Sequence, residues 1–292
     1  MNRILLLGGS GILGSEVSRL MDNKTVQLAS PSSAELDLRE EKSVITYILN
    51  FRPTCIINCA AWTNVDLAEK YFDSAFELNA TAVSHIASAA QLVHSQVIHI
   101  STDYVFNGES STPYLETAKE DPINKYGESK LRGERLLRMT VPDAYIIRTS
   151  WLYGFNGKNF VKTMIDKAVR NEEASVVNDQ IGSPTNAEEL GKGILEIMKR
   201  TPRPGVYNFS NTGSCSWFQL ARYVYSKLGS DSRLVSPVSS DSIVSPARRP
   251  RFTVLSKDKW REAGLGTIPP WEESLNGFLS QYLDRDLELG NL

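Results

Sequence analysis

Two side chains four residues apart are of the types that move a proton. Tyr126 and Lys130 lie within the segment 126–130, and on a helix they would share one face. A lysine ammonium beside a tyrosine favours the phenolate and lowers the pKa of the tyrosine. Such a tyrosine can give a proton to a carbonyl oxygen as a hydride reaches the carbon. Thr102 is a candidate to donate a hydrogen bond to the same carbonyl.

The Tyr-x-x-x-Lys spacing alone decides little, because it recurs as Tyr223 and Lys227. That second copy lies on an amphipathic helix predicted over 216–228, and we interpret it as packing and surface. The first copy follows Ser-Thr-Asp-Tyr at 101–104, just past a predicted strand. Ligands bind at the carboxyl ends of strands in open α/β sheets, so this position favours a site. The alternative for Thr102 is a turn hydroxyl bonded to nearby backbone.

A glycine turn at 8–14 follows the first predicted strand and opens the first predicted helix. Gly8, Gly11 and Gly14 recur at steps of three, which differs from the common G-x-G-x-x-G. One glycine permits the tight turn, the next lets the backbone approach a pyrophosphate, and the last lets helix and strand pack closely. The helix N-terminus then offers free N–H groups to the phosphates. The turn predicts dinucleotide binding, and a purely structural turn is the alternative.

The position that would hold the adenosine ribose leaves the cofactor open. An acidic residue at the end of the second strand would bind the ribose hydroxyls of NADH. Ser-Pro-Ser stands there at 30–32, and the nearest carboxylates are Glu35 and Asp37. The missing acid leaves room for the 2′-phosphate of NADPH. For Asp37 the alternative is an N-cap of the following helix.

Short apolar runs alternate with helical spacing along the first half of the chain. This rhythm predicts an α/β fold with a Rossmann-type, doubly wound parallel sheet. The strands are predicted at 3–7, 26–29, 55–59, 97–100, 144–147 and 206–209, and the helices at 12–21, 40–50, 72–92, 124–139, 160–169, 188–198 and 216–228.

Two units are expected from this rhythm. Residues 1–150 form the dinucleotide-binding domain, and a segment of about 185–212 returns to its sheet. Residues 151–292 mainly form a smaller C-terminal substrate-binding lobe. Residues 236–251 are rich in Ser, Pro and Arg and are predicted to be a loop.

Composition excludes several classes of protein. The chain has 292 residues and a formal net charge of -2, which gives no drive toward nucleic acid or acidic membranes. No apolar run approaches the ~20 residues of a membrane span, and the run at 4–7 is too short for a signal peptide. Cys55 and Cys59 lie too far apart on a strand for a disulfide, which favours the cytoplasm. With 3 histidines and 3 cysteines, no metal site is expected.

Several longer segments resemble one family. The chain is similar to the extended short-chain dehydrogenase/reductases and, within them, to the dTDP-4-dehydrorhamnose reductases, over nearly its whole length. The matching segments are the glycine turn at 8–14, NCAAWTNVD at 58–66, STDYVFNG at 101–108, the segment 126–130, RTSWLYG at 148–154, NDQIGSPT at 178–185 and ARRP at 247–250.

The resemblance implies a reaction and its catalytic residues. The family reduces the 4-keto group of dTDP-4-dehydro-L-rhamnose with NADH or NADPH, giving dTDP-L-rhamnose. Tyr126 would be the proton donor, Lys130 its electrostatic partner and a donor to the cofactor ribose, and Thr102 would tune the tyrosine. Some members dimerise through magnesium held by carboxylates, which makes a homodimer an expectation. Glu188 and Glu189 are candidates for that ion, but two exposed helix glutamates are the stronger interpretation.

The resemblance also implies binding residues. Asp37 and Leu38 would lie at the adenine, so Asp37 would not select the ribose. The remaining expected cofactor contacts are Gly8, Ser10, Gly11, Ile12, Leu13, Gly14, Ala60, Ala61, Thr63, Tyr126 and Lys130. The side chains expected to face the sugar nucleotide are Thr63, Val65, Thr102, Asp103, Tyr104, Tyr126 and Trp151.

The sequence departs from the family pattern at two positions and leaves other functions open. Cys59 and Trp62 stand where alanine and a smaller or polar residue are more usual, and Trp62 is placed to reshape the pocket. A 4,6-dehydratase would carry Thr-Asp-Glu, whereas this chain has Thr-Asp-Tyr at 102–104. A reductase giving the epimer dTDP-6-deoxy-L-talose and a binding subunit like methionine adenosyltransferase β stay open.

Overall fold

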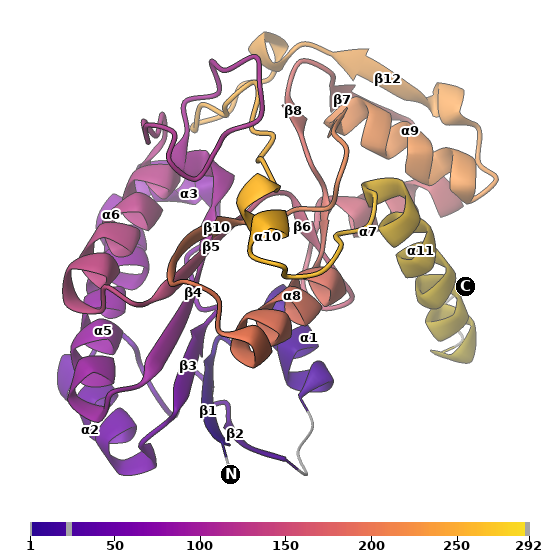
Figure 1. Ribbon diagram of the computed structural model, residues 1–292. Helices are drawn as coiled ribbons and strands as arrows, with labels where there is room; N and C mark the ends of the chain where they lie inside the picture. Colours follow the sequence, from indigo (N-terminus) through magenta and orange to yellow (C-terminus); the bar gives the residue numbers. More distant parts are fainter. Residues whose placement is uncertain (1, 22–24, 290–292) are drawn as a thin grey trace.

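A parallel sheet forms the centre of the computed structural model, which describes residues 2–21 and 25–289. Its six strands lie in the order β10-β5-β4-β3-β1-β2, and every neighbouring pair is parallel (Figure 1). This arrangement confirms the predicted fold class. The strands are β1 (Asn2–Leu7), β2 (Val26–Ala29), β3 (Cys55–Asn58), β4 (Gln96–Thr102), β5 (Tyr145–Thr149) and β10 (Gly205–Asn208).

Helices cover both faces of this sheet (Figure 1). On one face, α1 (Ile12–Leu20) and α8 (Ala187–Arg200) pack their apolar side chains against the sheet. On the other face lie α2 (Glu41–Phe51), α5 (Ala82–Val93) and α6 (Lys125–Thr140). Each face therefore has its own core, as the continuous apolar runs of buried parallel strands require.

The sheet reverses its direction of winding at β1. The chain passes from β1 to β2 on one side and then crosses to β3 on the other. In such sheets the crevice at the carboxyl ends of the two central strands is the ligand site. The segment between β2 and α2 forms no strand; it buries Leu36 and Leu38 under the sheet instead.

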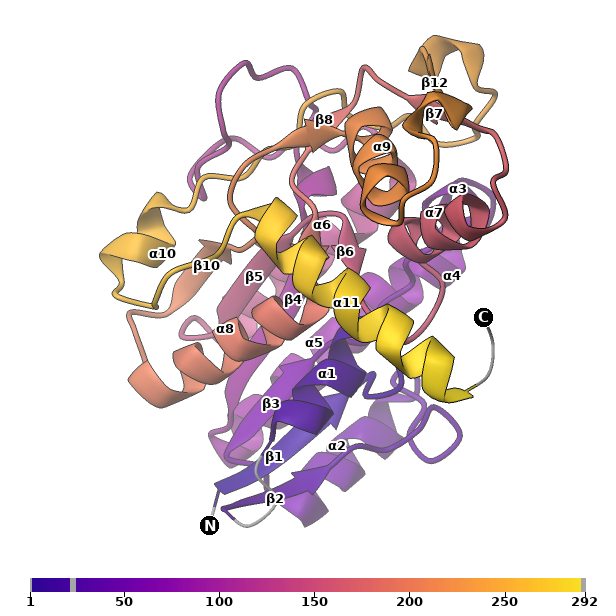
Figure 2. The ribbon, with the colours of Figure 1, turned by 90° about the vertical axis from the view of Figure 1, so that its right-hand side faces the viewer.

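A smaller group of elements lies beyond the carboxyl ends of the strands (Figure 2). It contains α7 (Phe160–Val169), α9 (Trp217–Lys227) and α11 (Trp271–Leu289), and a parallel pair of strands, β7 (Ala174–Val177) with β12 (Val235–Val238). These elements share a third apolar core. Between them, the chain returns to the main sheet through α8 and β10.

Short elements complete the described chain. They are α3 (Val65–Lys70), α4 (Phe72–Phe76), α10 (Asp258–Glu262), β6 (Leu152–Tyr153), β8 (Ile181–Gly182), β9 (Thr185–Asn186), β11 (Cys215–Ser216), a π-helical turn (Glu77–Thr81) and 3-10 turns at Asp103–Val105, Ser232–Leu234 and Ser240–Ser242.

Two predictions about the elements were wrong, and one alternative is excluded. Residues 236–251 are not all loop, because their start belongs to β12. The single helix predicted over 72–92 is α4, the π-helical turn and α5 in succession. Asp37 is not an N-cap, because α2 begins after Glu40. The elements not predicted from the sequence are α3, α10, α11, β6, β7, β8, β9, β11 and β12.

Candidate functional site

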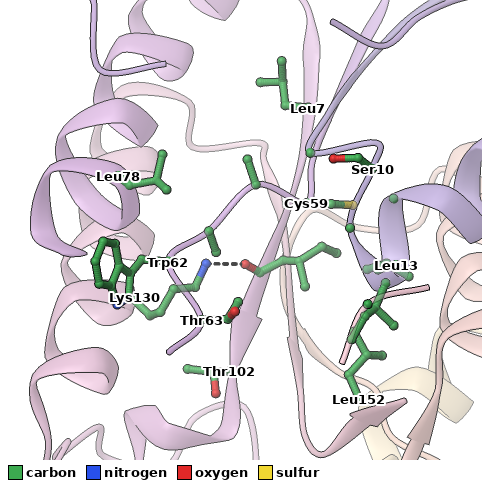
Figure 3. A pocket seen from close by; sticks show the side chains of 18 of the residues that line it. Leu7, Ser10, Leu13, Cys59, Trp62, Thr63, Leu78, Thr102, Lys130 and Leu152 are labelled. Atoms are coloured by element: carbon green, nitrogen blue, oxygen red, sulfur yellow. Dashed lines mark hydrogen bonds between the residues drawn. The ribbon is translucent and has the colours of Figure 1, made fainter. Parts of the chain in front are cut away.

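A cavity of about 1310 Å³ opens at the carboxyl ends of the strands, and every residue predicted to bind cofactor or substrate lines it. The glycine turn, the segments after β3 and β4, and α6 all contribute walls. Figure 3 shows side chains from these segments converging on one space.

Two glycines of the turn, Gly8 and Gly14, leave no room for a side chain. Gly8 has a φ of +76°, and a Cβ on it would lie 2.6 Å from the backbone nitrogen of Ala60. A Cβ on Gly14 would lie 2.1 Å from the carbonyl oxygen of Gly8. Gly11 is the N-cap of α1 and has no side chain, so it caps none of the first N–H groups of the helix. This cradle of backbone N–H groups fits a pyrophosphate.

The end of the cavity beside β2 carries carboxylates and one guanidinium group. Asp37 accepts from Arg39 in a two-pronged ion pair, with Nη2–Oδ2 at 2.6 Å, and hydrogen bonds with Arg39 lower the pKa of Asp37 to about 2. Glu35 accepts from the backbone and the hydroxyl of Ser32, each at 2.8 Å. Arg39 also lines the cavity and was missed by the sequence analysis. An arginine and a carboxylate at one end leave the choice between NADH and NADPH open.

The start of α6 is held close to the turn after β4. Asn124 caps the helix by accepting from the Gly127 N–H at 2.8 Å, and its amide donates to the carbonyl of Arg248 at 2.9 Å. A Cβ on Gly127 would lie 2.1 Å from the carbonyl oxygen of Tyr104. This close approach packs the rings of Tyr104 and Tyr126 edge to face, with centroids 5.9 Å apart.

Burial controls the titration of the predicted proton donor. Desolvation raises the pKa of Tyr126 to about 12, a hydrogen bond with Thr102 lowers it, and the charge of Asp103 raises it. Burial therefore outweighs the lowering of this pKa that was expected from Lys130. Lys130 donates to the carbonyl of Ile100 at 2.6 Å, the dashed line in Figure 3. Its own pKa falls to about 8, because burial disfavours the ammonium.

Asp103 is a second perturbed acid in the cavity. Its side chain is 2% exposed, and burial raises its pKa to about 7. The Thr102 hydroxyl donates to Asp103 Oδ1 at 3.0 Å and accepts from the Tyr104 N–H at 3.2 Å. Thr102 is therefore a turn hydroxyl, as the alternative predicted, and it also lines the cavity with Tyr126.

A second cavity of about 1300 Å³ adjoins the first and shares Tyr104 and Trp217 with it. Trp217, on α9, stacks on Trp151 with ring centroids 3.5 Å apart and planes 9° from parallel. The sequence analysis missed Trp217. Four cationic side chains line this second cavity: Lys167, Arg248, Arg249 and Arg251.

An ion pair joins the two halves of the chain at this cavity. Arg249 Nη2 lies 2.8 Å from Asp66 Oδ2, although 183 residues separate them. Ser245 also donates to Asp66 Oδ1, at 2.7 Å. The loop 245–251 is thereby fastened to the start of α3.

Outside the cavity, Tyr223 and Lys227 have the packing role predicted for them, whereas Glu188 and Glu189 are partly buried and not exposed. The Lys227 ammonium lies 5.2 Å from the Tyr223 ring centroid, and the Tyr223 hydroxyl donates to Asn276 at 3.1 Å. Glu188 and Glu189 form ion pairs with Lys192 at 3.1 and 2.9 Å. The described residues contain no group of three His, Cys, Asp or Glu side chains able to hold a metal ion, nor a helix long and apolar enough to cross a membrane.

The two residues that depart from the family pattern, Cys59 and Trp62, both line the cavity. All three cysteines are free thiols. The indole N–H of Trp62 donates to the carbonyl of Asn64 at 3.0 Å. The backbone N–H of Trp62 donates to the buried Asn79 side chain at 2.9 Å.

A doubly wound sheet with this glycine turn and this Tyr126–Lys130 helix defines a reductase of the extended short-chain dehydrogenase/reductase class. The chain belongs to the family described as the RmlD substrate binding domain, whose model matches residues 1–284.

Known proteins similar to the chain agree with this family. It is 36% identical to the spore coat polysaccharide biosynthesis protein SpsK of Bacillus subtilis, over 96% of this chain and 98% of that protein. It is 38% identical to a dTDP-4-keto-6-deoxy-D-glucose reductase of Streptomyces niveus, over 94% and 95%. The crystal structure of dTDP-4-dehydrorhamnose reductase from Bacillus anthracis, in complex with NADP, superposes with a TM-score of 0.93 at 38% identity, over 96% of this chain and 100% of that one.

Proposed function

We propose that the chain reduces the 4-keto group of dTDP-4-dehydro-L-rhamnose with NADPH or NADH, giving dTDP-L-rhamnose. One observation carries the proposal. The glycine turn and the trio Thr102, Tyr126 and Lys130 line the same cavity, at the carboxyl ends of β1 and β4. A dinucleotide on the turn and a carbonyl at the tyrosine are therefore within one continuous space.

Different lining residues would bind different parts of the cofactor. The backbone of 8–14 would hold the pyrophosphate, Asp37 and Leu38 the adenine, and Ala60, Ala61 and Thr63 the middle of the molecule. Lys130 would bind the nicotinamide ribose. When bound, the nicotinamide supplies the hydride.

The tyrosine supplies the proton. As the hydride adds to C4, the Tyr126 hydroxyl gives its proton to the carbonyl oxygen, which leaves a phenolate. Thr102, which lines the cavity beside Tyr126, would hold the same oxygen once its hydroxyl turns from Asp103. Because burial raises the pKa of Tyr126 to about 12, the hydroxyl keeps its proton until the developing alkoxide takes it.

The sugar nucleotide would extend from the first cavity into the second. Val65, Asp103, Tyr104 and Trp151 would face the sugar. The diphosphate is an anion that needs cationic partners. Four cations line the second cavity, and two of them, Arg249 and Arg251, already pair with Asp66 and Asp241. The flat Trp151–Trp217 stack stands between the cavities and would order the region where the nucleotide crosses.

Turnover tests the proposal against its rivals. Purified protein is incubated with NADPH or NADH and dTDP-4-dehydro-L-rhamnose, and oxidation of the cofactor is followed by absorbance. Tyr126→Phe is expected to lower kcat at least ~100-fold, the usual size of acid–base catalysis, with cofactor affinity nearly unchanged. Tyr223→Phe is the matched control, since it alters the other Tyr-x-x-x-Lys copy, and it should keep full kcat. Unchanged kcat in Tyr126→Phe would refute the assigned role.

Two alternative outcomes identify the rivals. If the sugar product is dTDP-6-deoxy-L-talose, the chain delivers the hydride to the opposite face of the 4-keto group. If the protein binds cofactor but turns over no 4-keto sugar nucleotide, it is a binding subunit. The homodimer and the cytoplasmic location stay predictions, which light scattering and cell fractionation test.

A further inference from the structure

A buried chain of hydrogen bonds lies behind the Lys130 amine. Lys130 Nζ is 3.4 Å from His99 Nε2, and His99 Nδ1 is 3.1 Å from the Asn58 amide nitrogen. The Asn58 amide oxygen accepts from the Ala60 N–H at 3.1 Å. None of Lys130, His99 and Asn58 is more than 2% exposed. The chain thus links the backbone under the cofactor cavity to the catalytic lysine.

The Asn58 amide determines which nitrogen of His99 carries the hydrogen. The atom that faces the Ala60 N–H must be the amide oxygen, because a donor needs an acceptor. The amide NH2 group therefore faces His99 and donates to Nδ1, which must offer a lone pair. Burial holds the pKa of His99 well below its ordinary value, so the ring is neutral. A neutral ring with a bare Nδ1 carries its hydrogen on Nε2.

This tautomer points a donor at the lysine. An ammonium has three N–H donors and no lone pair, so it cannot accept from His99 Nε2–H. A neutral amine has a lone pair and can accept this hydrogen while it still donates to the carbonyl of Ile100, 2.6 Å away. With the hydrogen on Nε2, the contact between His99 and Lys130 is a hydrogen bond only when Lys130 is an amine.

We propose that His99 is a positioning residue that donates its Nε2 hydrogen to the unprotonated amine of Lys130 and so makes the ammonium costly in this site. Asn58 acts through His99 by fixing the tautomer. Together they set the pH above which Lys130 stops supplying positive charge beside Tyr126. The proposal rests on the proposed function only for its kinetic readout.

Other groups near Lys130 do not replace this effect. Glu134 on α6 favours the ammonium, but its carboxylate already accepts from Arg148 at 2.7 Å and from Ser101. Burial raises the pKa of the Cys59 thiol to about 12, so it stays neutral at ordinary pH. His99 is the neighbour of Lys130 that the Asn58 amide orients.

Asn58→Asp tests the tautomer directly. The substitution keeps an oxygen for the Ala60 N–H but replaces the amide NH2 with a carboxylate oxygen, which requires the hydrogen on His99 Nδ1. Long-range proton–nitrogen NMR distinguishes the two ring nitrogens, and the signals that vanish in His99→Gln assign them. We expect hydrogen on Nε2 in the native protein and on Nδ1 in Asn58→Asp. Hydrogen on Nδ1 in the native protein would overturn the proposal, whether or not the protein turns over substrate.

The pH profile of kcat tests the consequence. In Asn58→Asp, and in His99→Gln, whose amide oxygen can accept from an ammonium, the fall of kcat at high pH should move up by about one pH unit. His94→Asn is the control, because His94 is exposed at the left-handed end of α5, where Asn is tolerated, and its profile should not move. A lower kcat with an unmoved profile in both variants would show a merely structural role and overturn the proposal.

Discussion

The buried carboxyl of Asp103 makes the stability of the protein depend on pH. Asp103 is 2% exposed, and burial raises its pKa from 3.8 to about 7. Asp103→Asn removes the ionisation and keeps an oxygen that can accept from the Thr102 hydroxyl. Between the two pKa values the folded state holds a proton that the unfolded chain has lost. The free energy of unfolding of the native protein therefore falls as pH rises toward 7.

The size of the effect follows from the shift. Each pKa unit corresponds to about 1.4 kcal/mol. From pH 5 to the folded pKa near 7, the native protein loses about 3 kcal/mol that Asp103→Asn does not lose. Beyond the folded pKa both states are ionised, and this loss stays constant at pH 8.

Urea unfolding at pH 5 and pH 8, followed by tryptophan fluorescence, measures this loss. The free energy of unfolding of Asp103→Asn, minus that of the native protein, should rise by about 3 kcal/mol between the two pH values. Asp143→Asn, at an exposed position, should show the same difference at both. The same difference at both pH values for Asp103→Asn would mean that the carboxyl ionises as in water, and would refute the reasoning.

Three further substitutions have expected outcomes. Lys130→Ala should weaken both kcat and NADPH affinity, measured by absorbance and by cofactor fluorescence; normal values for both would contradict its role. Gly14→Ala places a methyl group 2.1 Å from a backbone carbonyl, so it should lower stability by about 1–3 kcal/mol and weaken NADPH binding, whereas Gly277→Ala, with open space around it, should do neither. Trp217→Ala removes the stack on Trp151 and should raise KM for the sugar nucleotide about 2- to 10-fold, from the usual worth of an aromatic pair; an unchanged KM would place the nucleotide elsewhere.

The sheet was predictable because most of its strands are buried on both faces. Runs such as 4–7 and 144–147 are continuously apolar, and all six strands were predicted, although the edge strand β2 is only partly buried. β12 was not, because it lies at the edge of a two-stranded pair and contains Pro237, which is typical of loops and edge strands. The short helix α3 buries only Ala68 and so carries little periodicity.

The site was predictable where its residues are near one another in sequence. Thr102, Tyr126 and Lys130 follow from local motifs, but Trp217 and the Arg249–Asp66 pair depend on contacts between distant segments. The effect of Lys130 on Tyr126 could not be read from spacing. The helix places both side chains on one face, yet burial decides the pKa of the tyrosine.

The most direct test of the central claim is the product formed from dTDP-4-dehydro-L-rhamnose and NADPH, identified by NMR. The native protein should convert the keto sugar to dTDP-L-rhamnose, with one cofactor oxidised for each product formed. Tyr126→Phe should leave the keto sugar unchanged while still binding NADPH. Equal amounts of product from the two proteins would contradict the claim that Tyr126 supplies the proton.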